Sequence, residues 1–376
     1  MVDGTCAEEF APLRDLLVRN LEDGTDVGAA VAVVHDGDLV VDLWGGAARP
    51  GVPWREDTVV MTWSVTKAMS SLTVLALADR GVVDLDAPVA TYWPEFGAHG
   101  KERVLVRHLI SHTSGVPGWS RQVTVEDLLD VERSGDWLAE EPLWHEPGDG
   151  SAYQIVDHGH LVDGLVRRAA GRSLAEVFRD DIAGPFAADF MIGVPLDQQD
   201  RCADLIAPPP SGVDYSQLPP DSFLLRTMAN PLLLPEACNS PEWRSGPVGS
   251  VGGHGNARGV AQIQAAVSHG GAYGGRGLLG PATIDRVLEV QATGVDRVLM
   301  TPATWGTGFG LPMSSAPSVP GGRTCWWTGW GGAIVVNSLD SRTTVAYTPN
   351  RMASHLVASP RTDGYLDTAF ACVAGL

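Results

Sequence analysis

Two pairs of β-rich segments, one near each end of the 376-residue chain, constrain the fold most strongly. Near the start, Ala29 to His35 and Asp38 to Trp44 flank Asp36-Gly37, a tight-turn pair that is typical of β-hairpins. Near the end, Gly332 to Leu339 and Thr343 to Pro349 flank a short polar turn in the same way. Hairpins at opposite ends of a chain predict one antiparallel sheet that both termini close.

The sequence between these hairpins has a mostly helical pattern. Ser64 opens an apolar helical run that stops at Gly81, and helical spacing recurs in residues 10–22, 107–111, 125–129, 160–170 and 257–269. We therefore predict an α+β fold, an α/β sandwich in which helices flank the antiparallel sheet. Residues 1–75 and 250–376 would form the α/β domain and residues 76–249 a mostly helical inserted domain. The functional site would lie in the cleft between them.

Charge and composition exclude several classes of function. The formal net charge is −19, and a surface this acidic repels phosphate backbones and anionic membranes. We therefore expect no nucleic-acid partner and no membrane partner, and no apolar run approaches the ~20 residues of a membrane span. The acidic start lacks the regions of a signal peptide, and the five cysteines are odd in number and widely spaced. Both features favour a cytoplasmic protein with reduced thiols.

Lysine is almost absent from this chain. Of its 26 basic side chains only two are lysines, and one of them stands in Ser64-Val65-Thr66-Lys67. Arginine keeps its proton near neutral pH, whereas a desolvated lysine can lose its proton and serve as a base. Residues three apart share a helix face, so Lys67 would lie beside Ser64 at the N-terminus of the predicted helix. For this motif alone, a helix cap followed by a solvated lysine is the alternative interpretation.

Other segments carry residues suited to the same chemistry. Residues 147–152 lead to Tyr153, and Trp327-Thr328-Gly329-Trp330 enters the C-terminal hairpin, where glycines let a substrate approach the backbone. With these motifs the chain resembles the penicillin-recognising serine enzymes, in the class C β-lactamase-like branch that includes the family VIII carboxylesterases. The resemblance covers most of the chain, in ordered segments at residues 63–67, 81–89, 109–116, 147–164, 253–258 and 347–352.

The resemblance implies a serine β-lactamase or DD-peptidase-like fold and a set of residue roles. Ser64 would be the nucleophile, and Lys67 and Tyr153 would share the proton transfers of acylation and deacylation. The backbone N–H groups of Ser64 and Trp330 would form the oxyanion hole, which stabilises charge that develops only in the transition state. No metal and no organic cofactor is implied.

Two departures from the family pattern bear on the substrate. β-Lactamases carry Tyr-x-Asn, whereas this chain has an apolar residue in place of the asparagine, in Tyr153-Gln154-Ile155. The family's Lys-Thr-Gly motif, whose lysine helps to hold the β-lactam carboxylate, is Trp327-Thr328-Gly329 here. Both changes favour a neutral, apolar or aromatic acyl group. We expect loops between about residues 205 and 250 to wall the cleft, and the following residues to bind substrate: Trp327, Thr328, Gly329, Trp63, Ile155 and Trp119.

Signals for other chemistries are weaker. His108 and His112 are four residues apart, but no third ligand is spaced to match them, so no metal site is expected. The resemblance makes His112 a loop-structuring residue instead. No serine lies in a Gly-x-Ser-x-Gly elbow, which counts against an α/β-hydrolase.

We therefore expect a serine acyl hydrolase that acts on small carboxylic esters through an acyl-Ser64 intermediate. An acyltransferase that passes the acyl group to an amine or alcohol, for example in natural-product biosynthesis, stays open because the sequence does not define the acceptor. A β-lactamase or peptidase is disfavoured by Ile155 and Trp327. A binding protein that has lost its chemistry is disfavoured because Ser64, Lys67 and Tyr153 are all present in their motifs.

Overall fold

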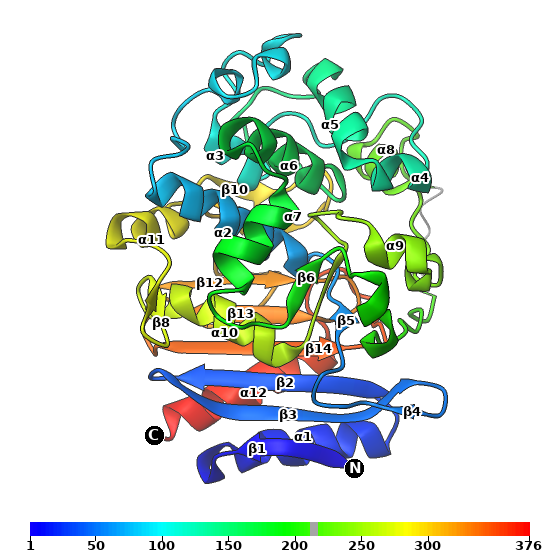
Figure 1. Ribbon diagram of the computed structural model, residues 1–376, viewed down its shortest axis with the longest axis vertical. Coiled ribbons are helices and arrows are strands. Elements are labelled where there is room, and N and C mark those ends of the chain that lie inside the picture. Colours follow the sequence, from blue (N-terminus) through cyan, green and yellow to red (C-terminus); the bar gives the residue numbers. More distant parts are fainter. Residues whose placement is uncertain (211–216) are drawn as a thin grey trace.

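A seven-stranded antiparallel sheet forms the centre of the part of the protein described by the computed structural model, residues 1–210 and 217–376 (Figure 1). Residues 211–216, which fall within the predicted wall of the cleft, lie outside the described residues. β4 (Val52–Pro53) pairs with β3 at one side. The other strands lie in the order β1 (Val2–Cys6), β3 (Asp38–Arg49), β2 (Gly28–His35), β14 (Thr343–Pro349), β13 (Ile334–Ser338) and β12 (Thr324–Thr328).

Strands from the two ends of the chain meet where β2 pairs with β14. Val33 lies opposite Val345 in this antiparallel register. The pairing confirms the prediction that both termini close one sheet. β3 extends to Arg49, beyond the predicted Trp44, and β1 is a strand that the sequence pattern did not indicate. The three central residues of β1 are solvent-exposed, so this segment has no alternation of apolar and polar residues.

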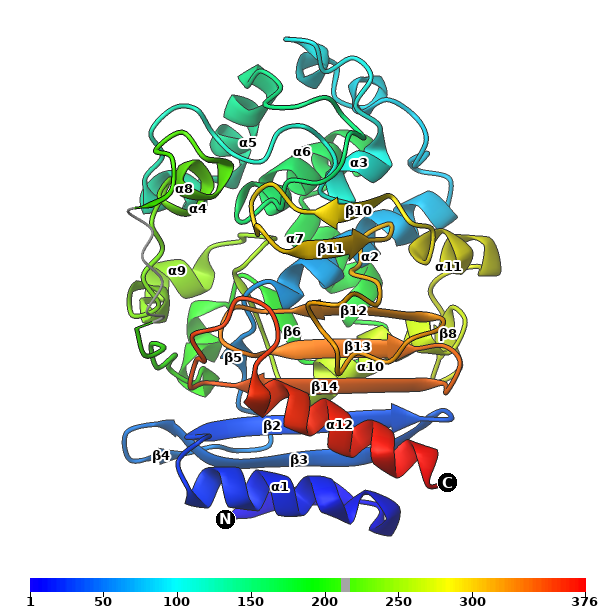
Figure 2. The same ribbon diagram turned by 180° about the vertical axis from the view of Figure 1, so that it is seen from behind.

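Helices cover both faces of the sheet. α1 (Ala11–Glu22) and α12 (Pro360–Ala374) pack on one face, and α10 (Ala257–Ser268) packs on the other (Figures 1 and 2). Successive side chains of a strand point to opposite faces. In β2, Val33 accordingly belongs to the apolar cluster with α1 and α12, whereas Val34 belongs to the cluster with α10. Burial on both faces explains why β2 is apolar almost throughout.

α2 (Val65–Asp79) runs through the interior and has Ser64 at its start. Its side chains are buried from Val65 to Leu77, so the helix is apolar around most of its circumference and only weakly amphipathic. Gly81 follows the helix with a φ of 71°, in the left-handed region where helices commonly end. The predicted helix that opens at Ser64 and stops at Gly81 is confirmed.

Mostly short helices form the end of the molecule opposite to β1 (Figure 1). Within residues 1–210 and 217–376, no helix has both the length and the apolar character needed to cross a bilayer. The helices predicted near residues 107–111, 125–129 and 160–170 are confirmed. The helices at this end are α3 (Val106–Ile110), α4 (Val125–Leu129), α5 (Val131–Glu140), α6 (Asp157–Ala170) and α8 (Phe223–Met228), while α7 (Leu174–Val177) and α9 (Pro241–Ser245) lie between them and the large sheet (Figures 1 and 2).

Short strand pairs connect the sheet and the helical end. β7 (Gly253–Gly255) pairs with both β5 (Val60–Met61) and β6 (Phe190–Ile192), so β6 links the predicted insertion to the rest of the chain. β10 (Ala292–Val295) and β11 (Pro302–Trp305) form a hairpin between the large sheet and the helical end (Figure 2). The division at residues 75 and 250 stays a prediction. The remaining strands are β8 (Ala272–Tyr273) and β9 (Arg276–Gly277), and the remaining α-helix of the described residues is α11 (Pro281–Val287).

Candidate active site

Ser64 is the N-cap residue of α2 and lies on the wall of a cavity. The preceding residue, Trp63, has a φ of 49°, a left-handed conformation that is costly for a residue with a side chain. Thr66 Oγ1 donates to the Trp63 carbonyl oxygen (2.6 Å) and accepts from the Gly253 N–H (2.9 Å), which holds this turn in place. The Ser64 side chain makes no capping bond, so its hydroxyl is available at a helix end that favours developing negative charge.

Lys67 lies one helical turn further along α2 and is fully buried. Its Nζ atom donates to the Ser64 hydroxyl (3.0 Å) and to the carbonyl oxygens of Ile155 (2.7 Å) and Ser250 (3.2 Å). Burial lowers the pKa of Lys67 to about 7, although the charge of the nearby Asp157 acts in the opposite direction. A lysine with this pKa is partly neutral near pH 7 and can accept the Ser64 proton.

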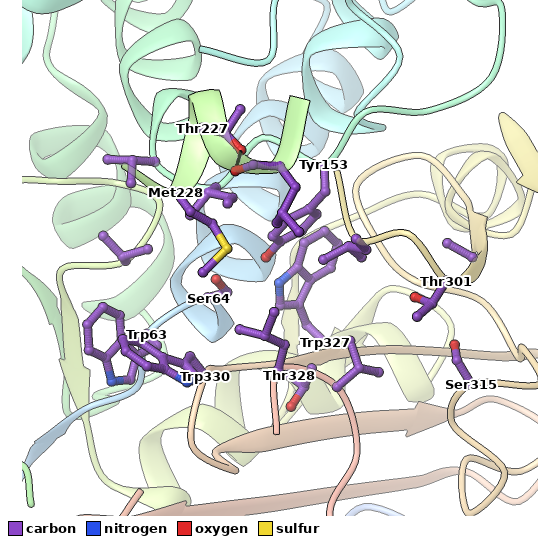
Figure 3. Close-up of a pocket in the computed structure, with 18 of the residues that line it drawn as sticks. Trp63, Ser64, Tyr153, Thr227, Met228, Thr301, Ser315, Trp327, Thr328 and Trp330 are labelled. Carbon is purple, nitrogen blue, oxygen red and sulfur yellow. Dashed lines mark hydrogen bonds between the residues drawn. The ribbon is translucent and has the colours of Figure 1, made fainter. Parts of the chain in front are cut away.

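Tyr153 presents its hydroxyl to Ser64 (Figure 3). Burial raises the pKa of Tyr153 above its ordinary value, and hydrogen bonds with the side chains of Ser64 and Trp327 offset only part of this rise. The phenol ring stacks on Trp305, with 5.7 Å between ring centroids, and Lys67 Nζ lies 5.0 Å from the Tyr153 centroid. The phenol therefore keeps its proton near neutral pH and can donate or relay it.

The turn that follows β12 passes close to the residues before Ser64. Gly329 is required there because a Cβ atom would lie 2.1 Å from the carbonyl oxygen of Thr62. Gly331 and Gly332 have φ values of 92° and 116°, which glycine adopts without strain. The three glycines thus allow a close approach and a sharp reversal that other residues would resist.

Trp330 belongs to this turn and contacts the residue before the serine. Its indole lies edge-on to that of Trp63, with 5.0 Å between centroids. Neither the Ser64 N–H nor the Trp330 N–H donates to an acceptor within residues 1–210 and 217–376. Two unused backbone donors at this position are what an oxyanion hole needs.

An apolar cavity of about 340 Å³ opens over Ser64 (Figure 3). Its described lining contains no charged side chain. The predicted residues Trp63, Ile155, Trp327 and Thr328 line it, together with Tyr153 and Trp330. The other lining residues are Val156, Pro208, Pro209, Pro210, Leu224, Thr227, Met228, Pro231, Leu232, Leu233, Val251, Leu299, Thr301, Pro302, Ala303, Trp305, Gly310, Met313, Ser315, Trp326, Ser354, Leu356 and Val357.

One wall of the cavity comes from residues 208–210, from residues 224, 227 and 228, and from residues 231–233. This confirms, for the described residues, the prediction that loops between about residues 205 and 250 wall the cleft. Another part of the lining carries the hydroxyl groups of Thr301 and Ser315 (Figure 3). No motif marks these two residues, and the sequence analysis missed them.

Two residues predicted to bind substrate do not line the cavity. Trp119 is buried, its indole N–H donates to the Ser134 carbonyl oxygen (2.9 Å), and its ring lies edge-on to His160. Because the partner of the indole N–H lies in α5, Trp119 belongs to the core and the prediction for it is wrong. Gly329 packs against the Thr62 carbonyl instead, so its small size serves backbone packing rather than lining the cavity.

Buried polar side chains lie next to Lys67 and Tyr153. Asp157 accepts a hydrogen bond from Gln154 Nε2 (3.0 Å), and burial raises the pKa of Asp157 to about 7. His112 Nδ1 accepts from the Gln154 N–H (3.1 Å), and the imidazole lies 4.6 Å from the Tyr153 ring. Burial holds the pKa of His112 well below its ordinary value, so the ring is neutral and its bond to Gln154 orders the loop. Asp157 carries no sequence signal of its own and was not predicted.

Asp296, a second buried carboxylate missed by the sequence analysis, fixes the segment that carries Tyr153. Its Oδ1 atom accepts from the N–H groups of Tyr153 (3.0 Å), Val298 (2.9 Å) and Leu299 (2.9 Å). Trp305 Nε1 donates to the other oxygen (3.4 Å). Asp296 therefore ties Tyr153 to the β10–β11 hairpin, which forms part of the cavity wall.

Comparison with known families agrees with this geometry, because the family described as Beta-lactamase matches residues 13–370 of the chain. This protein belongs to the beta-lactamase family. LipL of Mycobacterium tuberculosis, an esterase/beta-lactamase, is 32% identical over 347 residues, which cover 88% of this chain and 78% of LipL. The acyltransferase calJ of Penicillium decumbens is 33% identical over 158 residues, 35% of this chain and 37% of calJ.

The crystal structure of a family VIII carboxylesterase is similar to this beta-lactamase family member along the chain. The two share 33% sequence identity, and the TM-score is 0.92 over 99% of this chain and 100% of the carboxylesterase. The similarity confirms the α+β fold and the resemblance seen in the sequence motifs.

Proposed function

We propose that this beta-lactamase family member is a serine acyl hydrolase that cleaves small, neutral carboxylic esters through an acyl-Ser64 intermediate. The observation that carries the proposal is the 3.0 Å contact between the Ser64 hydroxyl and Lys67, a lysine whose pKa burial lowers to about 7. A serine hydroxyl is a weak nucleophile until a neighbouring base takes its proton. LipL and the structurally similar carboxylesterase are both named for ester cleavage, which supports the same substrate class.

In the first half-reaction, Lys67 accepts the Ser64 proton while the serine oxygen attacks the carbonyl carbon of the ester. The carbonyl oxygen becomes an oxyanion, and the N–H groups of Ser64 and Trp330 are the proposed donors that stabilise it. Tyr153 then gives its proton to the departing alkoxide as the C–O bond breaks. The protonated Lys67 returns a proton to Tyr153, and the alcohol leaves.

In the second half-reaction, water attacks the acyl carbon of the Ser64 ester. Tyr153 and Lys67 take the proton from this water and return one to the serine oxygen as the acyl–oxygen bond breaks. The products are a carboxylic acid and free Ser64. Each proton taken up is given back, so neither half-reaction requires a metal or an organic cofactor.

The cavity walls support a neutral and largely apolar acyl group. The described lining carries no cation, and Trp327 occupies the place of the lysine in the Lys-Thr-Gly motif of β-lactamases. A carboxylate buried here would lose its hydration without gaining an ion pair. A β-lactamase or peptidase is for this reason the less favoured reading, as is also indicated by the apolar Ile155.

The proposal places the site in a cleft between two parts of the chain. One part comprises residues 1–75 and 250–376, and the other is the insertion, residues 76–249. The cavity draws its walls from both groups of residues, which supports this arrangement. The proposal also includes a cytoplasmic location. All five cysteines are free thiols, a state that is common in reducing compartments and uncommon in oxidising ones.

An acyltransferase is the second candidate. The apolar walls around Ser64, which include Trp63 and Trp330, disfavour bound water and would prolong the acyl-enzyme. The nitrogen of an amine or the oxygen of an alcohol would then attack the acyl carbon in place of water. The partial match to calJ, named as an acyltransferase, favours the same reading.

Intact-protein mass spectrometry with p-nitrophenyl butyrate tests both candidates. We expect a transient mass increase of one butyryl group that decays in water, and neither adduct nor turnover in Ser64→Ala. An adduct that persists in water and clears only after addition of an amine or alcohol identifies an acyltransferase. Turnover close to that of the wild type in a folded Ser64→Ala protein would end both proposals.

A further inference from the structure

The first turn of α12 contacts the turn that carries Trp330, which we call the oxyanion turn (residues 329–332). Arg361 Nη2 donates to the carbonyl oxygen of Gly331 (2.7 Å), and Thr362 Oγ1 donates to that of Gly332 (3.1 Å). α12 crosses the face of the large sheet and reaches this turn with its N-terminal end (Figure 2). The Gly331 carbonyl lies only two peptide units from the N–H of Trp330, within the same turn.

Arg361 is itself anchored by a buried carboxylate near the other end of the chain. Its Nη1 atom lies 3.2 Å from Asp26 Oδ1 and donates to the Thr25 carbonyl oxygen (3.1 Å). The Asp26 side chain is fully buried, and that of Arg361 is 8% exposed. The hydroxyls of Tyr347 and Tyr365 donate to the two oxygens of Asp26, at 2.6 and 2.8 Å. Asp26 is therefore fixed by both a strand and a helix, and it in turn fixes the guanidinium.

The oxyanion turn needs an external support of this kind. Gly331 and Gly332 have positive φ values and the wide conformational freedom of glycine. The hydrogen bonds within the turn, Gly332 N–H to the Gly329 carbonyl (3.0 Å) and Gly329 N–H to the Ala333 carbonyl (2.7 Å), close it on itself. The Ala353 N–H also donates to the Gly331 carbonyl (2.9 Å), so this oxygen accepts two hydrogen bonds from outside the turn, and Arg361 supplies the one with a charged donor. An oxyanion donor accelerates a reaction only when it is held where the charge will develop.

A role in stability alone does not explain the buried ion pair. Replacement of buried ion pairs by well-packed apolar residues is often neutral or stabilising, because both charges lose their hydration on burial. The pair of Arg361 and Asp26 instead fixes the orientation of the Arg361 guanidinium. One Nη group is fixed on Asp26 and Thr25, which leaves the other aimed at a single carbonyl of the oxyanion turn.

We infer that Arg361 is a positioning residue for the oxyanion turn, and that Asp26 holds Arg361 in place for this purpose. The inference rests on the proposed function, since it assumes that the Trp330 N–H receives the oxyanion. Arg361 is not among the residues that line the cavity. It acts through the backbone of Gly331, so its loss should affect the transition state more than the binding of the ester.

The test is Arg361→Met, measured with p-nitrophenyl butyrate and with phenylboronic acid. Phenylboronic acid forms a tetrahedral adduct on the serine and places an oxygen in the oxyanion hole. We expect kcat to fall at least about tenfold with KM nearly unchanged, against the ~10²–10³ lost when an oxyanion donor is removed. The affinity for phenylboronic acid should fall by the same factor as kcat/KM. Circular dichroism of each variant gives the folded fraction to which its rates are normalised.

Arg244→Met is the matched control. Arg244 also has a side chain that is 8% exposed, and it pairs with Asp204 (2.6 Å) in a part of the protein outside the cavity lining. This variant should lose stability but keep kcat and the boronic acid affinity. Arg361→Lys keeps the charge but cannot bridge Asp26 and Gly331 with two nitrogens, so we expect an intermediate kcat. It also serves as the deciding variant if Arg361→Met does not fold.

Unchanged kcat and unchanged boronic acid affinity per folded site in Arg361→Met or Arg361→Lys would overturn the inference. So would equal losses of kcat in Arg361→Met and Arg244→Met. If the wild type forms no acyl adduct, or if Ser64→Ala retains turnover, the proposed function fails first and this inference fails with it. An acylated wild type with active Arg361 variants overturns only the positioning role.

Discussion

The Nζ atom of Lys67, whose side chain is fully buried, lies 3.0 Å from the hydroxyl oxygen of Ser64. Lys101, the second lysine of the chain, is also fully buried, and its Nζ atom donates to the carbonyl oxygen of Glu141. Burial lowers the pKa of Lys67 to about 7 and that of Lys101 to about 8. The two lysines thus share burial and differ in their neighbours, which makes them a natural pair for comparison.

Replacement of Lys67 by arginine is expected to lower kcat/KM at least about 10³-fold, because a guanidinium keeps its proton and cannot act as the base for Ser64. Lys101→Arg is the control, since it makes the same chemical change at a buried position outside the cavity lining. Ester hydrolysis and thermal unfolding should be measured for both variants. Equal kinetic losses in folded Lys67→Arg and Lys101→Arg would contradict a catalytic role for Lys67.

The pH dependence of kcat/KM should show an acidic limb near pH 7. Below this pH Lys67 is protonated and inactive as a base, so the rate rises with pH and then levels off as the neutral amine forms. The negative charge of Asp157 raises the pKa of Lys67. Asp157→Asn removes that charge, so the pKa of Lys67 falls and the acidic limb moves to lower pH. A limb that stays in place or moves to higher pH would refute the electrostatic coupling of these residues.

Neutral esters are expected to be better substrates than anionic esters of the same shape. p-Nitrophenyl 4-methylpentanoate and the mono-p-nitrophenyl ester of succinic acid differ mainly by a carboxylate in place of an isopropyl group. The described cavity lining offers this carboxylate no cation, so we expect kcat/KM to favour the neutral ester by about 100-fold or more. The spontaneous hydrolysis of each ester in the same buffer, which for the succinate includes attack by its own carboxylate, is measured without enzyme and subtracted. Equal corrected values would mean that the cavity does not exclude charge.

Asp296→Asn should weaken both the fold and the site. The amide would keep one acceptor oxygen but turn an NH₂ group towards a donor, either Trp305 Nε1 or the Tyr153 N–H. We expect a loss of about 1–3 kcal/mol in the free energy of unfolding and a several-fold fall in kcat as Tyr153 shifts. Urea denaturation and ester kinetics measure the two effects.

Asp163→Asn is the control for this variant. Asp163 is buried, accepts from the Leu174 N–H (2.8 Å), and pairs with Arg167 outside the cavity lining. It should lose stability and keep kcat per folded molecule. If Asp296→Asn behaves in the same way, the link between Asp296 and Tyr153 has no catalytic importance.

The part of the site that rests on local geometry could be predicted from the sequence. Ser64 and Lys67 stand three residues apart on a strongly apolar helix, and helical spacing alone brings them together. The two strand pairs at the chain ends stand out in the sequence as β-rich runs around short turns. From them the antiparallel sheet could be predicted. The carbonyl groups of Ile155 and Ser250, which complete the surroundings of Lys67, could not be predicted, because every residue has a carbonyl and only the tertiary fold selects these two.

The buried carboxylates show a second limit of prediction from the sequence. Asp296 bonds to a residue 143 positions away in the chain, and Asp157 and Asp26 likewise depend on tertiary contacts. Nothing in the local sequence distinguishes these from the other aspartates of an acidic chain. Tryptophan is ambiguous in the same way, because an indole suits a core as well as a cavity wall. Trp327 lines the cavity, whereas Trp119 is buried with its indole N–H bonded to the Ser134 carbonyl oxygen, and only the tertiary fold separates these roles.

The pairing of β2 with β14 has a consequence for synthesis on the ribosome. The hairpin of β2 and β3 emerges early, but one edge of β2 has no partner until residues 343–349 have been translated. An unpaired apolar edge is prone to aggregation, so we expect this edge of a nascent chain to be prone to aggregation until β14 is made. Arg361 and the glycines that it contacts are also made late. We therefore expect a chain that ends before residue 343 to have no esterase activity, since it lacks both the partner strand of β2 and the contact on the oxyanion turn.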